Sequence, residues 1–199
     1  MSNKIIFATS NKDKVKEAKM ILKDLEWEII SLKEAGITVD IIEDGKTFEE
    51  NAIIKAKTIM EMTGQIVISD DSGIEIDAFD KAPGIHSSRF LGIDTPYEEK
   101  NQHILDKLKD LEWDKRTARF ICAVACIFPD GETITRRGVM EGYIAYEIQG
   151  ENGFGYDPIF WLPKYNATSA QISPEEKNKE SHRAKALRAI KEDLKKYKA

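Results

Sequence analysis

The sequence predicts an α/β protein built on a mixed central β-sheet with flanking helices. Apolar runs typical of buried strands alternate along the chain with segments whose apolar residues recur at helical spacing. An Asp130-Gly131 turn between two strand-like runs predicts a hairpin within this alternation. No repeat, low-complexity tract or flexible linker interrupts the 199 residues, so we expect one domain over residues 1–199.

The first elements are a short buried strand over Lys4–Thr9 and a helix over about Lys12–Leu25. Ser10 and Asn11 are the natural caps of this helix, because their side chains can accept hydrogen bonds from its first N–H groups. A second strand is expected at about Trp27–Ser31, and an acidic loop follows it.

A capping box that begins at Thr47 predicts the next helix, which Gly64 should end in a left-handed conformation. A buried strand is expected at Gln65–Ser69, and alternating apolar and acidic residues predict a half-exposed strand over about 74–78. The polar residues Asp70–Gly73 between them are typical of a turn, so we expect a corner there.

Thr95 is expected to cap a helix that runs to about Leu111 with an apolar face at helical spacing. The segments Arg116–Phe128 and Thr133–Met140 flank the Asp130-Gly131 turn and are expected to form the hairpin.

A glycine-rich loop then leads to a strand at Ile159–Leu162. Ser173 is expected to start a short helix, and Ser181 a terminal one with an apolar stripe.

Charge and hydropathy exclude several classes of protein. The net charge of -5 argues against nucleic-acid binding through bulk charge. The longest apolar run, Phe120–Phe128, is too short to span a bilayer, and residues 1–8 hold too short an apolar stretch for a secretory signal. Cys122 and Cys126 would lie about 13 Å apart along one strand, too far for a disulfide. We therefore expect a cytoplasmic protein with reduced core cysteines that binds neither nucleic acid nor membranes.

Two segments suit a polyphosphate and a divalent metal ion. At the first strand-to-helix junction, hydroxyl, amide and ammonium groups surround free helix N–H groups; these residues are Thr9, Ser10, Asn11, Lys12, Asp13 and Lys14. Asp70 and Asp71 end a buried strand, and such oxygen ligands suit Mg²⁺, beside which a carboxylate can accept a proton from water. Glu43 can join this pair or stay solvated. An ordinary helix cap and two turn aspartates are the alternatives.

Three further features suit a nucleotide. Lys55, beside an apolar helix stripe, either contacts phosphate or extends to water. The loop Gly153–Pro158 combines flexible glycines with aromatic faces for a planar ring, or is only a tight turn. Lys177, His182 and Arg183 can donate hydrogen bonds to the edge of a base, or are plain surface residues.

The order of these motifs resembles the inosine triphosphate pyrophosphatase family, which hydrolyses non-standard purine nucleoside triphosphates. The resemblance runs nearly end to end. It is carried by Thr9-Ser10-Asn11 with Lys14, the stretch Gly45–Lys57, Asp70-Asp71-Ser72-Gly73, Ala82-Pro83-Gly84-Ile85 with Ser87 and Arg89, Gly153–Pro158, and Ser181-His182-Arg183.

The resemblance implies hydrolysis of ITP, dITP or XTP to the monophosphate and pyrophosphate with Mg²⁺. It also implies a cleft between two lobes joined by a long mixed sheet, and a homodimer. The segment Thr9–Lys14 and Lys55 would hold the phosphates, and Asp71 would accept the proton of the attacking water. Asp70 and Asp71, with Glu43, would hold the metal. The residues implied to line the substrate are Ser72, Phe154, Gly155, Tyr156, Asp157, Lys177, His182 and Arg183, with Phe154 stacking on the base.

The expected reaction is attack of water at the α-phosphorus, with discrimination through the 6-oxo group of the base. A buried donor from Arg183, Lys177 or a backbone N–H would pair with that oxygen but would face the amino group of adenine. Two other functions stay open: a purine nucleotide sensor without catalysis, and a Mg²⁺-dependent phosphatase that releases orthophosphate.

Overall fold

The computed structural model describes residues 4–197, so residues 1–3 of the segment considered for a secretory signal lie outside it. Its helices and strands in chain order are β1 (Lys4–Phe7), α1 (Lys12–Ile21), β2 (Glu28–Ser31), α2 (Phe48–Thr63), β3 (Val67–Ile76), α3 (Tyr97–Leu108), β4 (Thr117–Ile127), β5 (Thr133–Ile144), β6 (Phe160–Leu162), β7 (Ala167–Thr168), α4 (Pro174–Glu180) and α5 (His182–Leu194). Among the described helices, none has the length and apolar character needed to cross a membrane.

The strands form one seven-stranded sheet in the order β2-β1-β3-β4-β5-β6-β7. Strand β1 is parallel to both β2 and β3, whereas β6 is antiparallel to both β5 and β7. The predicted α/β class with a mixed sheet is therefore confirmed.

The chain divides into two compact units. Unit 1 comprises Met1–Asp71, Cys122–Gly138 and His182–Ala199, and unit 2 comprises Ser72–Ile121 and Val139–Ser181. The single domain and the cleft expected from the sequence stay predictions.

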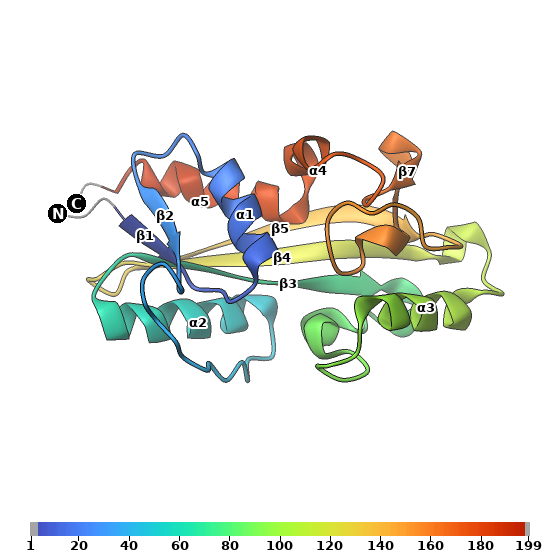
Figure 1. Cartoon of the computed structure of the whole chain (residues 1–199), viewed down its shortest axis with the longest axis horizontal. Helices are drawn as coiled ribbons and strands as arrows, with labels where there is room; N and C mark the ends of the chain where they lie inside the picture. The colour runs from blue at the N-terminus through green and yellow to red at the C-terminus, as the bar shows by residue number, and fades with distance from the viewer. Residues whose placement is uncertain (1–3, 198–199) are drawn as a thin grey trace. The chain divides into compact units, whose positions relative to one another are not determined.

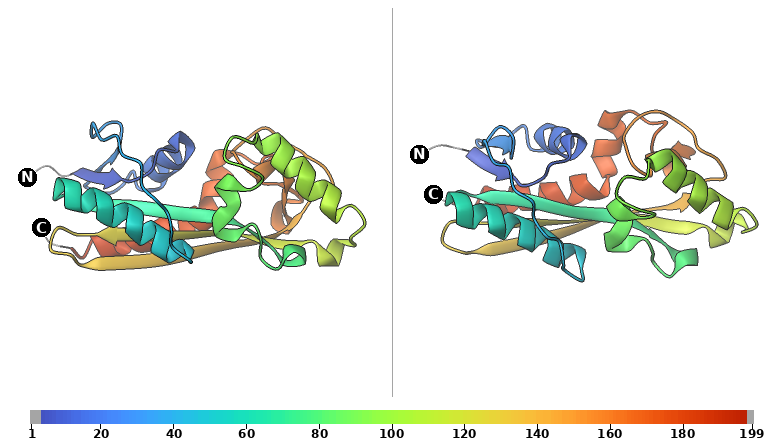
Figure 2. Two further views of the ribbon diagram at one scale, coloured as in Figure 1. Left: turned by 90° about the horizontal axis from the view of Figure 1, so that it is seen from below. Right: turned by 60° about the horizontal axis from the view of Figure 1, so that its bottom comes forward.

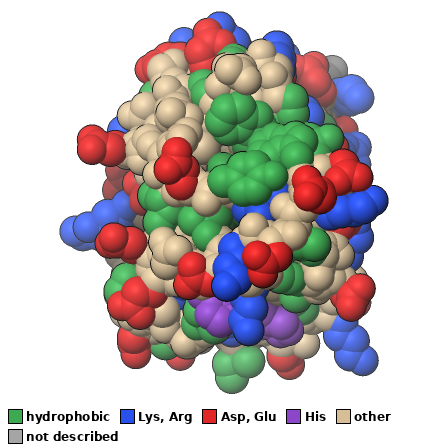
Figure 3. Space-filling model, turned by 90° about the vertical axis from the view of Figure 1, so that its right-hand side faces the viewer, with side chains coloured by type: hydrophobic (Ala, Val, Ile, Leu, Met, Phe, Trp, Pro, Cys, Tyr) green, Lys and Arg blue, Asp and Glu red, His purple; other side chains and the backbone are tan. Residues whose placement is uncertain are grey.

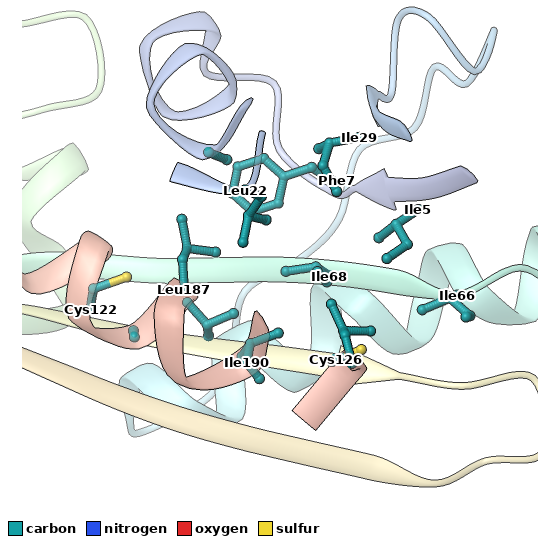
Figure 4. Close-up of a cluster of buried hydrophobic side chains, with 14 of the residues drawn as sticks. Ile5, Phe7, Leu22, Ile29, Ile66, Ile68, Cys122, Cys126, Leu187 and Ile190 are labelled. Atoms are coloured by element: carbon teal, nitrogen blue, oxygen red, sulfur yellow. The ribbon is translucent and has the colours of Figure 1, made fainter. Parts of the chain in front are cut away.

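Helices cover both faces of the sheet within unit 1. Helices α1 and α5 lie on one side of its strands and α2 lies on the other (Figure 1), and both views in Figure 2 show α2 alongside β3. The core on the α1 and α5 side joins Phe7 and Ile68 to Leu22, Leu187 and Ile190 (Figure 4).

Both cysteines lie in this same core. Cys122 and Cys126 are buried and carry free thiols, as predicted.

Strand β3 is continuous where we expected a corner. Residues Asp70–Gly73 lie inside it, so the predicted turn is wrong. Alternate side chains of the strand meet different helices: Ile68 packs in the core of α1 and α5, while Ser69 donates a hydrogen bond to Ala52 O of α2. The turn preference of the aspartates is overridden because basic side chains from other elements pair with them inside the fold.

The predicted starts of the first two helices are confirmed. The Asn11 side chain caps α1, and Thr47 Oγ1 accepts from Glu50 N at 3.1 Å to cap α2, which Gly64 ends at a φ of 62°. Helix α1 ends at Ile21 rather than Leu25, because a turn from Leu22 O to Leu25 N brings Leu25 back onto the core.

Helix α3 starts and ends differently from the prediction. Thr95 does not cap it, since its hydroxyl donates to Leu91 O at 2.7 Å, and Pro96 occupies the cap position. The helix ends at Leu108 rather than Leu111, where the guanidinium of buried Arg116 binds Leu108 O.

The predicted hairpin and the two last helices are confirmed. Gly131, at a φ of 90°, donates its N–H to Phe128 O between β4 and β5, and β5 continues to Ile144. Ser173 caps α4, and α5 begins directly after Ser181. The two-residue strand β7 was not predicted.

Aromatic side chains cluster in unit 2. Trp113 stacks on Tyr143 with ring centroids 5.0 Å apart, and Tyr146 and Trp161 pack against the same indole. Figure 3 shows hydrophobic side chains gathered beside acidic ones on one face of this unit.

Candidate active site

Asp71, the predicted catalytic residue, is held by the start of α2. Asn51 Nδ2 donates to Asp71 Oδ2 at 3.1 Å, and Lys55 Nζ lies 3.6 Å from Asp71 Oδ1. Lys55 also donates to Glu43 Oε2 at 2.5 Å. One ammonium group therefore joins a carboxylate on β3 to a carboxylate on the loop before α2.

The helical repeat explains how α2 supplies these groups. Asn51 and Lys55 are four residues apart and therefore lie on one face of the helix. The fully buried Ala52 and Ala56 follow them, and such small side chains let α2 approach β3 closely. Polar donors thus reach Asp71 from a helix face that is otherwise apolar.

Burial and charge act on the two partners differently. Burial raises the pKa of Asp71 above its ordinary value, and the positive charge of Lys55 offsets only part of this rise. Burial alone would lower the pKa of Lys55, but the carboxylates of Asp71, Asp70 and Glu43 outweigh it and raise that pKa. The arrangement pairs a charged lysine with a carboxylate that is a stronger base than an exposed one.

Asp70 lies in a separate ion-pair cluster and is fully buried. Its Oδ2 lies 3.0 Å from Lys14 Nζ and accepts from Arg183 Nε at 3.2 Å. Arg183, also buried, makes a second ion pair with Glu17 of α1. Burial would raise the pKa of Asp70, but the charges of Lys14 and Arg183 outweigh it and hold the pKa well below its usual range.

The partners of the two aspartates come from opposite faces of the sheet. Asp70 is bound from α1 and α5, and Asp71 is bound from α2. Neighbouring side chains of a strand point to opposite faces, so the two carboxylates have different direct partners. The charges of Lys14 and Lys55 nevertheless act on both carboxylates.

The start of α1 brings three of its six predicted phosphate residues together. Thr9 Oγ1 accepts from Asn11 N at 3.2 Å, and Asn11 Oδ1 accepts from the N–H groups of Asp13 and Lys14. Lys14 reaches Asp70, as described above. Lys12 and Asp13 are exposed on the first turn, and Ser10 is exposed just before the Asn11 cap.

A second cluster lies in unit 2, around Asp157. Its Oδ2 accepts from Phe154 N at 2.9 Å and from Lys177 Nζ at 2.6 Å, and Lys177 Nζ lies 5.1 Å from the centre of the Phe154 ring. At Gly153, with a φ of 75°, a Cβ would lie 2.1 Å from Asp157 Oδ2, so only glycine fits. Among residues 4–197, buried Asp157 Oδ1 has no hydrogen-bond partner. The predicted base-binding loop thus brings an aromatic ring and a carboxylate together with the Lys177 ammonium group of α4.

Tyr156 and Gly155 anchor this loop. Tyr156 is buried, and its hydroxyl donates to Ser87 O at 2.6 Å while its ring packs edge-on against Tyr97. Gly155 O accepts from Asn101 Nδ2 at 3.0 Å. The Tyr156 ring is therefore packed in the core of unit 2.

Of two further predicted substrate residues, Ser72 was expected in a corner and His182 at the start of the terminal helix; the structure contradicts the first position and confirms the second. Ser72 is half-buried within β3. His182 is buried at the first position of α5, where Gly138 of β5 packs so closely that a Cβ would lie 2.0 Å from His182 O.

Neither Asn51 nor Glu17 was among the predicted site residues. Helical spacing could have indicated both. Asn51 lies four residues before Lys55, and Glu17 lies three residues after Lys14, so each shares a helix face with a predicted site residue.

No group of three or more His, Cys, Asp or Glu side chains suited to a metal ion occurs in the described part of the chain. A pair of carboxylates is nevertheless enough for Mg²⁺, which completes its shell with water and substrate phosphate. Glu43 and Asp71 both lie within ion-pair distance of Lys55.

The fold and these clusters define an α/β protein with an acid–lysine centre at the start of α2 and a side-chain-capped N-terminus on α1. A sequence profile described as the Ham1 family matches residues 5–193. The chain belongs to the Ham1 family, and the relationship expected from its motifs is confirmed.

Relatives with assigned names cover almost the whole chain. A dITP/XTP pyrophosphatase of Exiguobacterium sibiricum is 46% identical over 94% of both chains. A dITP/XTP pyrophosphatase of Clostridium perfringens is 44% identical over 96% of this chain and 97% of its own.

Solved structures agree with the fold. The Ham1 protein of Coxiella burnetii superposes with a TM-score of 0.88 at 40% identity, covering 98% of this chain and 99% of its own. The Ham1 protein of Staphylococcus aureus superposes with a TM-score of 0.87 at 38% identity, covering 98% of this chain and 100% of its own.

Proposed function

We propose that this chain is a nucleoside triphosphate pyrophosphatase that hydrolyses the non-standard purine nucleotides dITP, ITP and XTP to the monophosphate and pyrophosphate. The observation that carries the proposal is the Glu43–Lys55–Asp71 centre, found in a chain that is similar over nearly its full length to dITP/XTP pyrophosphatases.

In the proposed reaction a water molecule attacks the α-phosphorus while Asp71 accepts its proton. A bond forms between the water oxygen and phosphorus, the bond to the bridging oxygen breaks, and that electron pair leaves with pyrophosphate. Lys14 and Lys55, with the first turn of α1, neutralise and orient the phosphates. The contacts of Asp71 with Asn51 and Lys55 support its role as the base, because they hold its carboxylate in a fixed orientation.

Asp71 and Glu43 are the proposed ligands of Mg²⁺, because both carboxylates approach one ammonium group. Two carboxylates, completed by water and substrate phosphate, satisfy this ion. The bound ion would supply charge neutralisation along the triphosphate. Asp70 stays a proposed ligand as well: Lys14 and Arg183 bind its Oδ2, whereas its buried Oδ1 has no hydrogen-bond partner among the described residues.

We propose that the Phe154 cluster takes the purine base. Lys177 is favoured over Arg183 as the donor to the 6-oxo group, because Lys177 lies over Phe154 whereas Arg183 binds Asp70 and Glu17. We further propose that the protein is cytoplasmic and forms a homodimer. Size-exclusion chromatography with light scattering would test the dimer.

A panel of purine triphosphates with Mg²⁺ tests the reaction. We expect rapid pyrophosphate release from ITP, dITP and XTP. Release from ATP should be slower by at least about a hundredfold, because the buried hydrogen-bond donor of the protein then faces the amino group of adenine, which is also a donor. A coupled pyrophosphate assay measures the rates.

The products separate this proposal from its alternatives. Orthophosphate released from ITP would identify a phosphatase acting on the terminal phosphate. Tight ITP binding with no cleavage would identify a sensor. Either result would overturn the proposed function.

Phe154→Ala is expected to raise KM for ITP about 5–150-fold, since stacking of a base on an aromatic ring contributes about 1–3 kcal/mol. Steady-state kinetics measure the change. Tyr165→Ala, at a half-buried aromatic position outside this cluster, is the matched control. An unchanged KM in Phe154→Ala would show that the Phe154 ring does not bind the base.

A further inference from the structure

Asn51 lies between Asp71 and the loop that carries Glu43. Its side chain is 1% exposed. While Nδ2 donates to Asp71 Oδ2 at 3.1 Å, Oδ1 accepts from Gly45 N at 2.9 Å. One amide therefore binds a strand on one side and a loop on the other.

The loop approaches Asn51 so closely that only glycine fits at position 45. A Cβ on Gly45 would lie 2.6 Å from Asn51 Oδ1 and 2.8 Å from Glu50 Cβ. The same loop is fastened to α2 twice more, by Lys46 N to Glu50 Oε2 at 2.6 Å and by Glu43 to Lys55. The start of α2 thus fixes the position of this loop, including Glu43.

We propose that Asn51 is a positioning residue that sets the orientation of the Asp71 carboxylate and its spacing from the Glu43 loop. An isolated carboxylate can rotate about its terminal bond, but a donor on Oδ2 holds its plane and keeps Oδ1 toward Lys55. Only a side chain with both a donor and an acceptor serves both partners, which favours an amide here over a carboxylate or an apolar group. The inference rests on the proposed function, since it concerns the same reaction.

Asn51→Ala is the direct test. We expect kcat for ITP to fall about 10–100-fold, the range for loss of an outer partner of a functional group, with KM changed by less than about threefold. The matched control is Ser69→Ala, which removes another buried hydrogen bond between β3 and α2 without touching Asp71. The control is expected to lower the unfolding midpoint while leaving kcat per folded molecule nearly unchanged.

A double-mutant cycle with Asp71→Asn separates positioning from a general loss of stability. If Asn51 acts through Asp71, Asn51→Ala costs little in the Asp71→Asn background, measured in single-turnover assays at high enzyme concentration. Equal losses of kcat in both backgrounds would overturn the inference, and so would an unchanged kcat in Asn51→Ala.

Gly45→Ala provides a second route should Asn51→Ala not fold. This position is half-exposed, and the added Cβ pushes on Asn51 from the loop side, so we expect a similar fall in kcat with little change in KM. A kcat equal to that of the unmodified enzyme would overturn the inference. Failure of the unmodified enzyme to release pyrophosphate would instead overturn the proposed function.

Discussion

Asp71→Asn is expected to lower kcat for pyrophosphate release from ITP by about 10³-fold, within the range that a positioned general base contributes. The amide has nearly the same shape but accepts a proton far less readily and carries no charge for a metal ion. The side chain stays buried against α2, and its oxygen can still accept from Asn51. The fold should therefore survive, and steady-state kinetics at saturating Mg²⁺ measure the loss.

Asp94→Asn is the control for this substitution, because it makes the same chemical change at an exposed position of unit 2. It should leave kcat within about twofold, as substitutions at exposed sites without special contacts do. An Asp71→Asn enzyme that kept a tenth or more of its kcat would show that another group accepts the proton.

Arg183→Met is expected to lower the free energy of unfolding by about 3–5 kcal/mol, the usual cost of removing one partner of a buried ion pair. Arg183 is 1% exposed, and its guanidinium lies between Asp70 and Glu17. The variant therefore removes an ion-pair partner from both carboxylates. Denaturant unfolding measures the loss. Arg188→Met, at an exposed position on the same helix, serves as the control.

The pH dependence of this loss follows from the pKa of Asp70. In the unmodified protein Lys14 and Arg183 hold that pKa below its ordinary value, so the stabilisation is present above about pH 4 and is lost only as pH falls below it. When Arg183 is removed, burial raises the pKa of Asp70. The buried carboxyl group is then tolerated at a pH below that pKa, where it is protonated, and destabilises the fold at a higher pH, where it is charged. The destabilisation should therefore be smaller at pH 5 than at pH 8. An equal loss at both values would show that Asp70 keeps its low pKa through Lys14 alone.

Local signals predicted the elements that carry the site. The capping residues Asn11 and Thr47 are confirmed, because a cap is a contact between residues two or three positions apart. The buried stripe of α2 and the hairpin at Gly131 follow from helical spacing and turn chemistry in the same way. The residue types suited to phosphate and metal chemistry were also visible in the sequence.

At Asp70–Gly73, local sequence preferences predicted a corner, but the structure has an extended strand. Aspartates favour turns when their only partners are nearby backbone groups. In the fold, Asp70 is paired with Arg183, 113 residues away, and Asp71 with Asn51, 20 residues away, and these contacts keep β3 extended. Such partners have no periodic signature in the sequence.

The sequence by itself determined the α/β class, most of the caps and turns, and the motifs that place the chain among its relatives, because each depends on neighbouring residues or on their order. Only the tertiary structure decided that the side chains of Asp70 and Asp71 point to opposite faces of one strand and that Asn51 binds Asp71. The physical reason is that a charged side chain inside a protein is oriented by whichever counter-charges and donors the packed helices bring to it, and packing joins residues that are distant along the chain.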